Sequence, residues 1–210
     1  MPDLLVAGVT GLIGGEILTK DLSQFNRVIC LARKDIDLAK EYYQLLKTDF
    51  VDIVLPDSQS DDAVICALGT TIKKAGSQKA FKQVDYQMVM NLAKAAKEKG
   101  YERFLLVSSL GADHQSRNFY LKTKGELEES LKSLGFKHLC FVRPSLLLGD
   151  RKEFRLGEKI GMVLLPLINP LLMGKLKRYG PIDARRVAER LVKQSREQSE
   201  ALVVFESDEI

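Results

Sequence analysis

The sequence predicts an α/β fold in which helices cover both faces of a doubly wound parallel sheet. Strand-like and helix-like segments alternate along the 210 residues, as they do in chains built from strand–helix–strand units. The strand-like segments are short, continuous apolar runs, which are typical of strands buried on both faces. The first run leads into a glycine turn that opens a helix. The length suits one domain over residues 1–210, with a lid or substrate region inserted at about 145–180.

The elements expected in the first half of the chain begin at an apolar run and are separated by polar turns. Residues 35–40 are too polar to assign to a helix or a strand. The predicted strands are Leu4–Val9, Arg27–Leu31, Tyr43–Leu46 and Ala63–Leu68, and the predicted helix is Leu12–Leu22.

Two amphipathic helices dominate the second half, and each ends at a glycine that can adopt a left-handed conformation. The first is expected over Gln78–Lys99 before Gly100, and the second over Arg117–Leu134 before Gly135. The remaining elements are strands over Phe104–Val107, His138–Val142 and Leu202–Phe205, and a helix over Asp183–Gln198.

An apolar stretch over Ile160–Met173 contains Pro166, Asn169 and Pro170. A membrane span needs about 20 apolar residues, so this stretch is too short and too interrupted to be one. We expect it to form a lid over the substrate pocket or a buried subunit contact, in preference to an interfacial membrane anchor.

The composition fits an ordinary globular protein, with 45% hydrophobic and 29% charged residues. The net charge of +4 suits an anionic cofactor, but no dense basic tract favours nucleic acid. Cys30, Cys66 and Cys140 lie far apart in apolar runs and are expected to be core thiols. No metal-ligand spacing occurs. Met1-Pro2-Asp3 leads straight into a strand without a signal-like region, which predicts a cytoplasmic protein.

The glycine turn predicts a Rossmann-type dinucleotide site. Gly8, Gly11 and Gly14 follow the first strand and open the first helix. In this context the first glycine allows a tight turn, the second lets the backbone approach a pyrophosphate, and the third allows close helix–sheet packing. The spacing is G-x-x-G-x-x-G instead of G-x-G-x-x-G. The residues expected to contact the cofactor here are Gly8, Thr10, Gly11, Leu12, Ile13 and Gly14.

The end of the second strand favours NADP(H) over NAD(H). An NAD site usually has an acidic residue there to bind the ribose 2′-hydroxyl, whereas this chain has Arg33 and Lys34. A guanidinium and an ammonium suit a 2′-phosphate. Asp49, with Phe50 beside it, is expected to accept from the adenine amino group, and Leu68, Gly69 and Thr70 are expected to run under the cofactor.

Tyr120 and Lys124 stand four residues apart on a predicted helix, and therefore on one face of it. A neighbouring ammonium favours the phenolate, as a general acid/base requires. Ser108 and Ser109 end the preceding buried strand. A hydroxyl there could hydrogen-bond a substrate carbonyl or alcohol, and the choice between the two serines stays open.

In combination, these motifs resemble the short-chain dehydrogenase/reductase superfamily, and most closely the small atypical branch that includes the Tat-interacting-protein oxidoreductases. The resemblance covers nearly the whole chain. Its more specific blocks are Leu68–Thr71, Lys74–Ser77, Val84–Asp85, Ser108–Asp113, Tyr120–Glu126, Arg143–Pro144 and Gly149–Arg151.

The resemblance implies an NADP(H)-dependent oxidoreductase acting on a small carbonyl or alcohol. Tyr120 would be the acid/base, Lys124 would support it and bind the nicotinamide ribose, and Ser109 is favoured over Ser108 as the orienting serine. Arg143, Pro144 and Ser145 would bring backbone near the nicotinamide amide, and Arg151 and Arg155 would hold an anionic group of the substrate.

Two other functions are open. One is a non-catalytic NADP(H)-binding redox sensor or regulator, since the branch is associated with protein partners. The other, ranked third, is a nucleotide-sugar epimerase or dehydratase. The sequence leaves open the substrate, the direction of reaction, and whether the chain binds a protein partner or forms a homodimer.

Overall fold

The computed structural model describes residues 1–59, 61–149, 178–197 and 201–210. Its centre is a seven-stranded sheet with the order β3-β2-β1-β4-β5-β6-β9, in which all pairings are parallel. This confirms the predicted α/β fold of the Rossmann type. The strands are β1 Leu4–Ala7, β2 Val28–Ala32, β3 Tyr43–Lys47, β4 Ala63–Cys66, β5 Arg103–Val107, β6 His138–Arg143 and β9 Leu202–Glu206.

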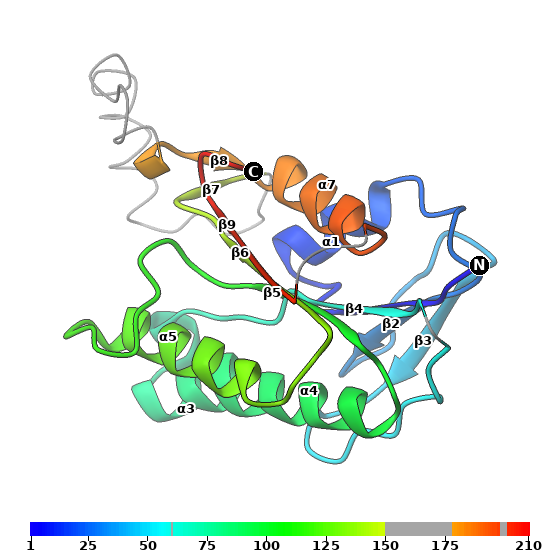
Figure 1. The fold of residues 1–210 in the computed structure, drawn as a ribbon, viewed down its shortest axis with the longest axis horizontal. Coiled ribbons are helices and arrows are strands. Elements are labelled where there is room, and N and C mark those ends of the chain that lie inside the picture. Colours follow the sequence, from blue (N-terminus) through cyan, green and yellow to red (C-terminus); the bar gives the residue numbers. More distant parts are fainter. Residues whose placement is uncertain (60, 150–177, 198–200) are drawn as a thin grey trace.

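Helices cover both faces of the sheet (Figure 1). On one face lie α1 (Leu12–Thr19) and α7 (Ala184–Gln194), which pack against each other, and on the other lie α4 (Val89–Glu98) and α5 (Phe119–Lys132). The strands serve both layers because successive side chains point to opposite faces. In β1, Leu4 and Val6 join the core under α1 and α7, whereas Leu5 and Ala7 join the core under α4 and α5.

The strand order changes direction between β1 and β4, so the loops at the carboxyl ends of these strands diverge to opposite faces. Ligands of open parallel sheets bind in the crevice at such a point. Most of the predicted site residues in the described ranges directly follow β1, β2, β3, β4, β5 or β6, and they therefore lie at this one edge of the sheet.

The long helix predicted after β4 is present, but it contains a segment of different geometry. It runs as α3 (Gln78–Lys82), a π-helical segment η1 (Gln83–Met88) and α4, and a short helix α2 (Ile72–Ala75) precedes it. The π-helix has a wider turn than the α-helix and often marks a functional site. In η1, Asp85 is only 1% exposed although it is charged.

Other elements match the prediction with shifted ends. A parallel pair of two-residue strands, β7 (Leu147–Leu148) and β8 (Ile182–Asp183), was not expected. Cys30, Cys66 and Cys140 are buried and free, as expected. None of the helices in the described ranges is long and apolar enough to cross a membrane. The apolar stretch 160–173, together with Arg151 and Arg155, lies outside the described residues.

Candidate active site

The turn between β1 and α1 is packed so tightly that Gly8 and Gly14 have no room for a side chain. Gly8 has a φ of +87°, and a Cβ atom on it would lie 2.4 Å from the carbonyl oxygen of Ala67, just beyond β4. A Cβ atom on Gly14 would lie 2.1 Å from the carbonyl oxygen of Gly8. The turn therefore passes across the end of β4, at the point where the strand order changes direction.

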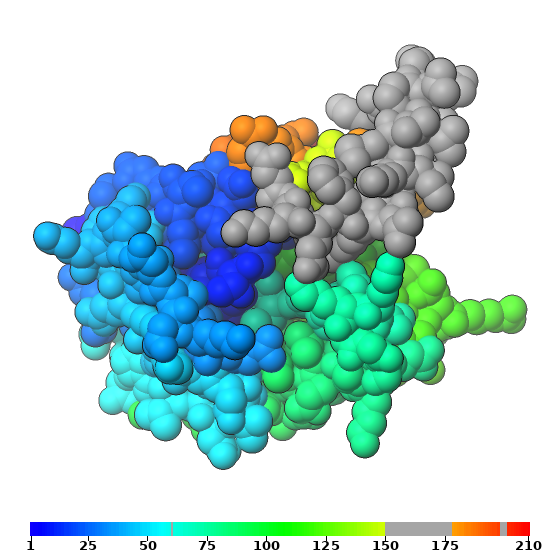
Figure 2. Space-filling view, turned by 180° about the vertical axis from the view of Figure 1, so that it is seen from behind, coloured from blue at the N-terminus to red at the C-terminus, as the bar shows by residue number. Residues whose placement is uncertain are grey.

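The amino terminus of α1 is open to a ligand. Gly11 is its N-cap and provides no side-chain hydrogen bond to the first amides of the helix. Such amides and the positive end of the helix dipole attract anions. Leu12 lies beside Gly149, since a Cβ atom placed on Gly149 would lie 2.7 Å from Leu12 Cδ1. On the face in Figure 2, the surface is hollowed between blue N-terminal residues and green residues from the middle of the chain.

The ends of β2 and β3 carry exposed charges. Arg33 and Lys34 are exposed and form no ion pair within the part of the chain that the structure describes. The next acid, Asp35, is paired with Lys47, whose Nζ lies 2.7 Å from its Oδ2. A basic end of β2 is thus left available to an anionic group.

After β3, the structure separates the two residues predicted to meet the adenine. Asp49 is exposed, and its Oδ1 accepts a hydrogen bond from the Val51 amide at 2.8 Å. Phe50 has a φ of +64° and is 2% exposed, in the core beneath α4. The ring of Phe50 is therefore a core side chain and does not accompany Asp49 at the surface.

Lys124 is held by Asp85, a residue to which the sequence motifs assign no role. Its Nζ lies 2.9 Å from Asp85 Oδ1, and both side chains are almost fully buried. The other oxygen of Asp85 accepts a hydrogen bond from the Thr70 amide at 2.8 Å. Gly69 is adjacent, since its Cβ atom would lie 3.4 Å from Asp85 Oδ1 and 4.0 Å from Lys124 Nζ. The loop predicted to run under the cofactor is thereby joined to Lys124.

The charge state of Lys124 depends on these neighbours. Burial by itself lowers the pKa of Lys124, but the Asp85 carboxylate and Tyr120 outweigh it, so that pKa is raised above its usual value. The lysine is therefore an ammonium ion at neutral pH. The only sequence signal for Asp85 was its place in one of the blocks of the family resemblance.

Tyr120 is fixed at the start of α5, one turn before Lys124. The N-cap residue Asn118 accepts hydrogen bonds through its side chain from the amides of Tyr120 and Leu121, at 2.9 and 3.2 Å. The half-buried ring of Tyr120 packs against Phe81, with 5.5 Å between ring centroids. Tyr120 and Lys124 thus share a helix, as the spacing predicted.

The two serines after β5 have different surroundings. Ser108 is 5% exposed, and its hydroxyl donates to Glu128 Oε1 at 2.5 Å. Ser109 is half-buried, and its hydroxyl makes only a long local contact of 3.4 Å with the Leu110 carbonyl. Of the two hydroxyls, that of Ser109 is the one not committed to a strong internal bond.

Arg143 at the end of β6 belongs to a network of charges. Its guanidinium contacts Glu128 Oε2 at 2.5 Å and Glu206 Oε1 at 2.9 Å. Hydrogen bonds with Glu128 raise the pKa of Arg143 above its already high value. Each nitrogen of this guanidinium therefore already has a carboxylate partner.

Pro144 and Ser145 are also held internally. The carbonyl of Pro144 accepts from the Leu110 amide at 3.0 Å. Ser145 donates its amide to the Ser207 hydroxyl at 3.2 Å, accepts from that hydroxyl at 2.8 Å, and donates its own hydroxyl to the Gly180 carbonyl. The segment after β6 is therefore fixed to the segments that follow β5 and β9.

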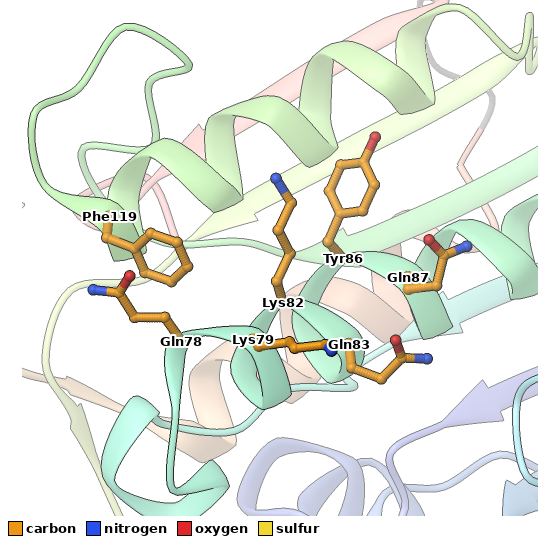
Figure 3. Close-up of a pocket in the computed structure, with 7 residues that line it drawn as sticks. All are labelled: Gln78, Lys79, Lys82, Gln83, Tyr86, Gln87 and Phe119. Carbon is orange, nitrogen blue, oxygen red and sulfur yellow. The ribbon is translucent and has the colours of Figure 1, made fainter.

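A groove of about 420 Å³ lies between α3, η1 and the start of α5 (Figure 3). It contains none of the predicted site residues. One of its sides carries Lys82, whose Nζ pairs with Glu126 Oε2 at 2.8 Å. Its lining residues are Gln78, Lys79, Lys82, Gln83, Tyr86, Gln87 and Phe119.

Comparison with known proteins identifies the family. The family described as NAD(P)H-binding matches residues 8–161, which include the glycine turn, the two serines, Tyr120 and Lys124. The chain belongs to this NAD(P)H-binding family. The Rossmann fold and the NAD(P)-binding, oxidoreductase-like character expected from the sequence are thereby confirmed.

Individual members and neighbours agree with this assignment. The chain is 38% identical over 192 residues to the protein named "Protein FMP52, mitochondrial" of Candida albicans, covering 87% of this chain and 82% of that one. It is 36% identical over 162 residues to protein HTATIP2 of Rattus norvegicus, covering 74% and 66%. The relationship to HTATIP2 confirms the resemblance to the atypical short-chain dehydrogenase/reductase branch.

The fold is shared with MoeE5, solved in complex with UDP-glucose and NAD, at a TM-score of 0.71 and 14% identity, covering 97% of this chain and 75% of that one. At this identity the likeness shows the fold alone.

The predicted cytoplasmic location is contradicted. FMP52 relatives from several yeasts are named as mitochondrial proteins. The prediction relied on the first residues, Met1-Pro2-Asp3, which carry no information that separates the cytoplasm from an organelle.

Proposed function

We propose that this protein is an NADP(H)-dependent oxidoreductase that reduces a small carbonyl compound or oxidises the corresponding alcohol. The observation that carries the proposal is the junction at Lys124. This lysine follows Tyr120 by one helical turn and lies beside Gly69 and Thr70, the loop after β4. Tyr120, which is suited to acid/base chemistry, is thus connected through Lys124 to the loop after β4, which is suited to a dinucleotide.

The residues around the β1–α1 turn fit the dinucleotide. Gly8 and Gly14 leave no room for side chains, so backbone lines the turn. The uncapped start of α1 at Gly11 offers amide donors to the pyrophosphate. Arg33 and Lys34 would bind the 2′-phosphate, and Asp49 would accept from the adenine amino group.

The reactive part of the site would be supplied by α5 and the end of β5. Bound NADP(H) would supply or accept a hydride at its nicotinamide ring. Tyr120 would give a proton to the carbonyl oxygen, or take it from the alcohol, and the Lys124 ammonium would stabilise the phenolate. Ser109 would hydrogen-bond the same oxygen, because the Ser108 hydroxyl already donates to Glu128.

Because FMP52 relatives are named as mitochondrial, we propose that the protein acts in mitochondria. Tagged protein imaged together with a mitochondrial marker tests this. A diffuse cytoplasmic signal would contradict it.

The binding of NADPH, NADP⁺, NADH and NAD⁺ to purified protein, measured by thermal shift and calorimetry, tests the cofactor. We expect a preference of about tenfold or more for the phosphorylated pair, which corresponds to about 1.4 kcal/mol. A screen of small aldehydes and ketones with NADPH then tests turnover. Tight binding without any turnover would favour a redox sensor, and failure to bind any of the four nucleotides would remove the enzyme proposal.

A further inference from the structure

The Asp85–Lys124 ion pair differs from all others among the described residues. Its two side chains are 1% and 4% exposed, and no other pair has both partners below 5%. Removing one partner of a buried pair leaves an uncompensated charge in a medium that solvates it poorly. The charged state of each residue therefore depends on the presence of the other.

The groups that face Lys124 come from three elements. Asp85 approaches from η1, Tyr120 from α5 and Cys66 from the end of β4. Burial raises the pKa of Cys66 to about 12, so its thiol is neutral. Asp85 is thus the one carboxylate that balances Lys124 within the part of the chain that the structure describes.

Asp85 also reaches the loop after β4. While Oδ1 binds the ammonium, Oδ2 accepts the Thr70 amide at 2.8 Å. One carboxylate therefore fixes both the loop proposed to lie under the cofactor and the lysine proposed to support Tyr120. The π-helical turns of η1 place it there, because the wider backbone turn changes which residues of the long helix face inwards.

We propose that Asp85 is a positioning residue of the active site, which keeps Lys124 as an ammonium ion and fixes it beneath Gly69 and Thr70. The inference rests on the proposed function for its effect on turnover. Its effect on the charge of Lys124 concerns the folded chain alone, so the two can be tested separately.

The substitution Asp85→Asn removes the ion pair with Lys124 but retains the hydrogen bond with the Thr70 amide. The asparagine retains an oxygen that can accept the Thr70 amide, but it has no charge to balance Lys124. Burial then lowers the pKa of Lys124 below the usual lysine value of about 10.4. The lysine loses its proton as the pH rises through this lowered pKa, and its support of Tyr120 is lost with it.

The first measurement is the pH dependence of kcat with NADPH and a carbonyl identified in the screen. We expect kcat of Asp85→Asn to fall on the order of tenfold more than that of the wild type between about pH 6 and about pH 9. The KM for NADPH should change little, since the Thr70 contact persists. An unchanged pH profile together with an unchanged kcat would overturn the proposal.

The second measurement is the pH dependence of stability, followed by urea unfolding without cofactor. In Asp85→Asn the unfolded chain binds more protons than the folded one between the lowered pKa of Lys124 and about 10.4. Its stability should therefore rise with pH in this window. In the wild type the pKa of Lys124 is raised, so the contribution of the pair is fully present below about 10.4 and is lost as the pH rises through the raised pKa of the folded chain.

Two further variants decide the interpretation. Lys124→Met added to Asp85→Asn removes the titrating group, so the rise of stability with pH should disappear. Glu126→Gln is the matched control, because Glu126 joins α5 to α3 through Lys82 at the surface; its pH profiles should equal those of the wild type.

A protein that shows no turnover with any carbonyl would defeat the proposed function, while the stability measurement would still decide the role of Asp85. If the stability of Asp85→Asn depends on pH in the same way as that of the wild type, that role is overturned. If Asp85→Asn fails to fold, recovery of folding in the double variant supports the proposal, and failure of both variants contradicts it.

Discussion

The two halves of the candidate site consist of different kinds of groups. Around β1 and β2, the site consists of bare backbone and exposed charges, with Gly8 and Gly14 in the turn and Arg33 at the strand end. Around β5, β6 and α5, it consists of buried charges that bind one another, with Asp85 on Lys124 and Glu128 on Arg143. The first half can bind a ligand directly, whereas most of the second half supports a few groups that can.

This difference indicates how each half should respond to mutation. An exposed charge affects the ligand or side chain that it contacts and contributes little to the free energy of unfolding. A buried charge influences folding, and it alters chemistry only through the residue that it holds. Substitutions in the two halves should therefore change different measured quantities.

The largest effect on turnover is expected from Tyr120→Phe. The substitution removes the proton donor but keeps the ring that packs on Phe81. General acid/base groups contribute about 10²–10⁴-fold, so kcat should fall by that order while NADPH affinity in calorimetry changes little. A variant with unchanged kcat would show that Tyr120 is not the acid/base.

The kcat values of Ser108→Ala and Ser109→Ala should differ by about two orders of magnitude. Ser109→Ala removes the hydroxyl proposed to bind the reacting oxygen, and loss of such a donor typically lowers kcat about 10²–10³-fold. Ser108→Ala removes a bond to Glu128 and should reduce stability more than kcat. Steady-state kinetics and urea unfolding of both variants test this assignment, and the reverse pattern would assign Ser108 to the reaction.

Glu128→Gln should destabilise the fold by about 3 kcal/mol, because among the described residues it leaves the half-buried Arg143 with Glu206 alone as an ionic partner. Glu126→Gln on the same helix breaks an exposed pair and should cost less than about 1 kcal/mol. The two free energies of unfolding can be measured in urea. Equal values would refute the distinction between buried and exposed charges.

The smallest effect on function is expected at the end of β2. Arg33→Ala should weaken NADP(H) binding about tenfold, or about 1.4 kcal/mol, because a charge-assisted bond to the phosphate is lost. NAD(H) binding and the stability of the fold should hardly change, since Arg33 is exposed. Equal weakening of both cofactors would exclude a role in recognising the 2′-phosphate.

The same contrast explains how much could be predicted from the sequence. The glycine turn and the strands are local patterns, because a turn that excludes Cβ atoms requires glycine and a doubly covered strand requires a continuous apolar run. The spacing of Tyr120 and Lys124 is also local, and their place on one helix was predicted.

The partners of the buried charges could not be predicted in this way. Asp85 lies on η1, and Glu206 lies on β9, 63 residues after Arg143. Such pairs depend on which segments the fold brings together, and a lone acid on an amphipathic helix usually faces solvent. The orientation of Phe50 could not be predicted for the same reason: it stands next to Asp49 in the sequence, but its backbone turns the ring into the core.

The three buried thiols provide a natural probe of how the molecule opens. Burial raises the pKa of Cys30 to about 11 and those of Cys66 and Cys140 to about 12, so almost no thiolate is present near neutral pH. Alkylating reagents and oxidants attack the thiolate, and they can reach these sulfurs only when the surrounding layers separate. Cys66 lies beside Asp85 and Lys124, whereas Cys30 lies in the core under α1 and α7. The labelling rate of each thiol, followed by mass spectrometry, would therefore report how often its own side of the sheet becomes exposed to solvent.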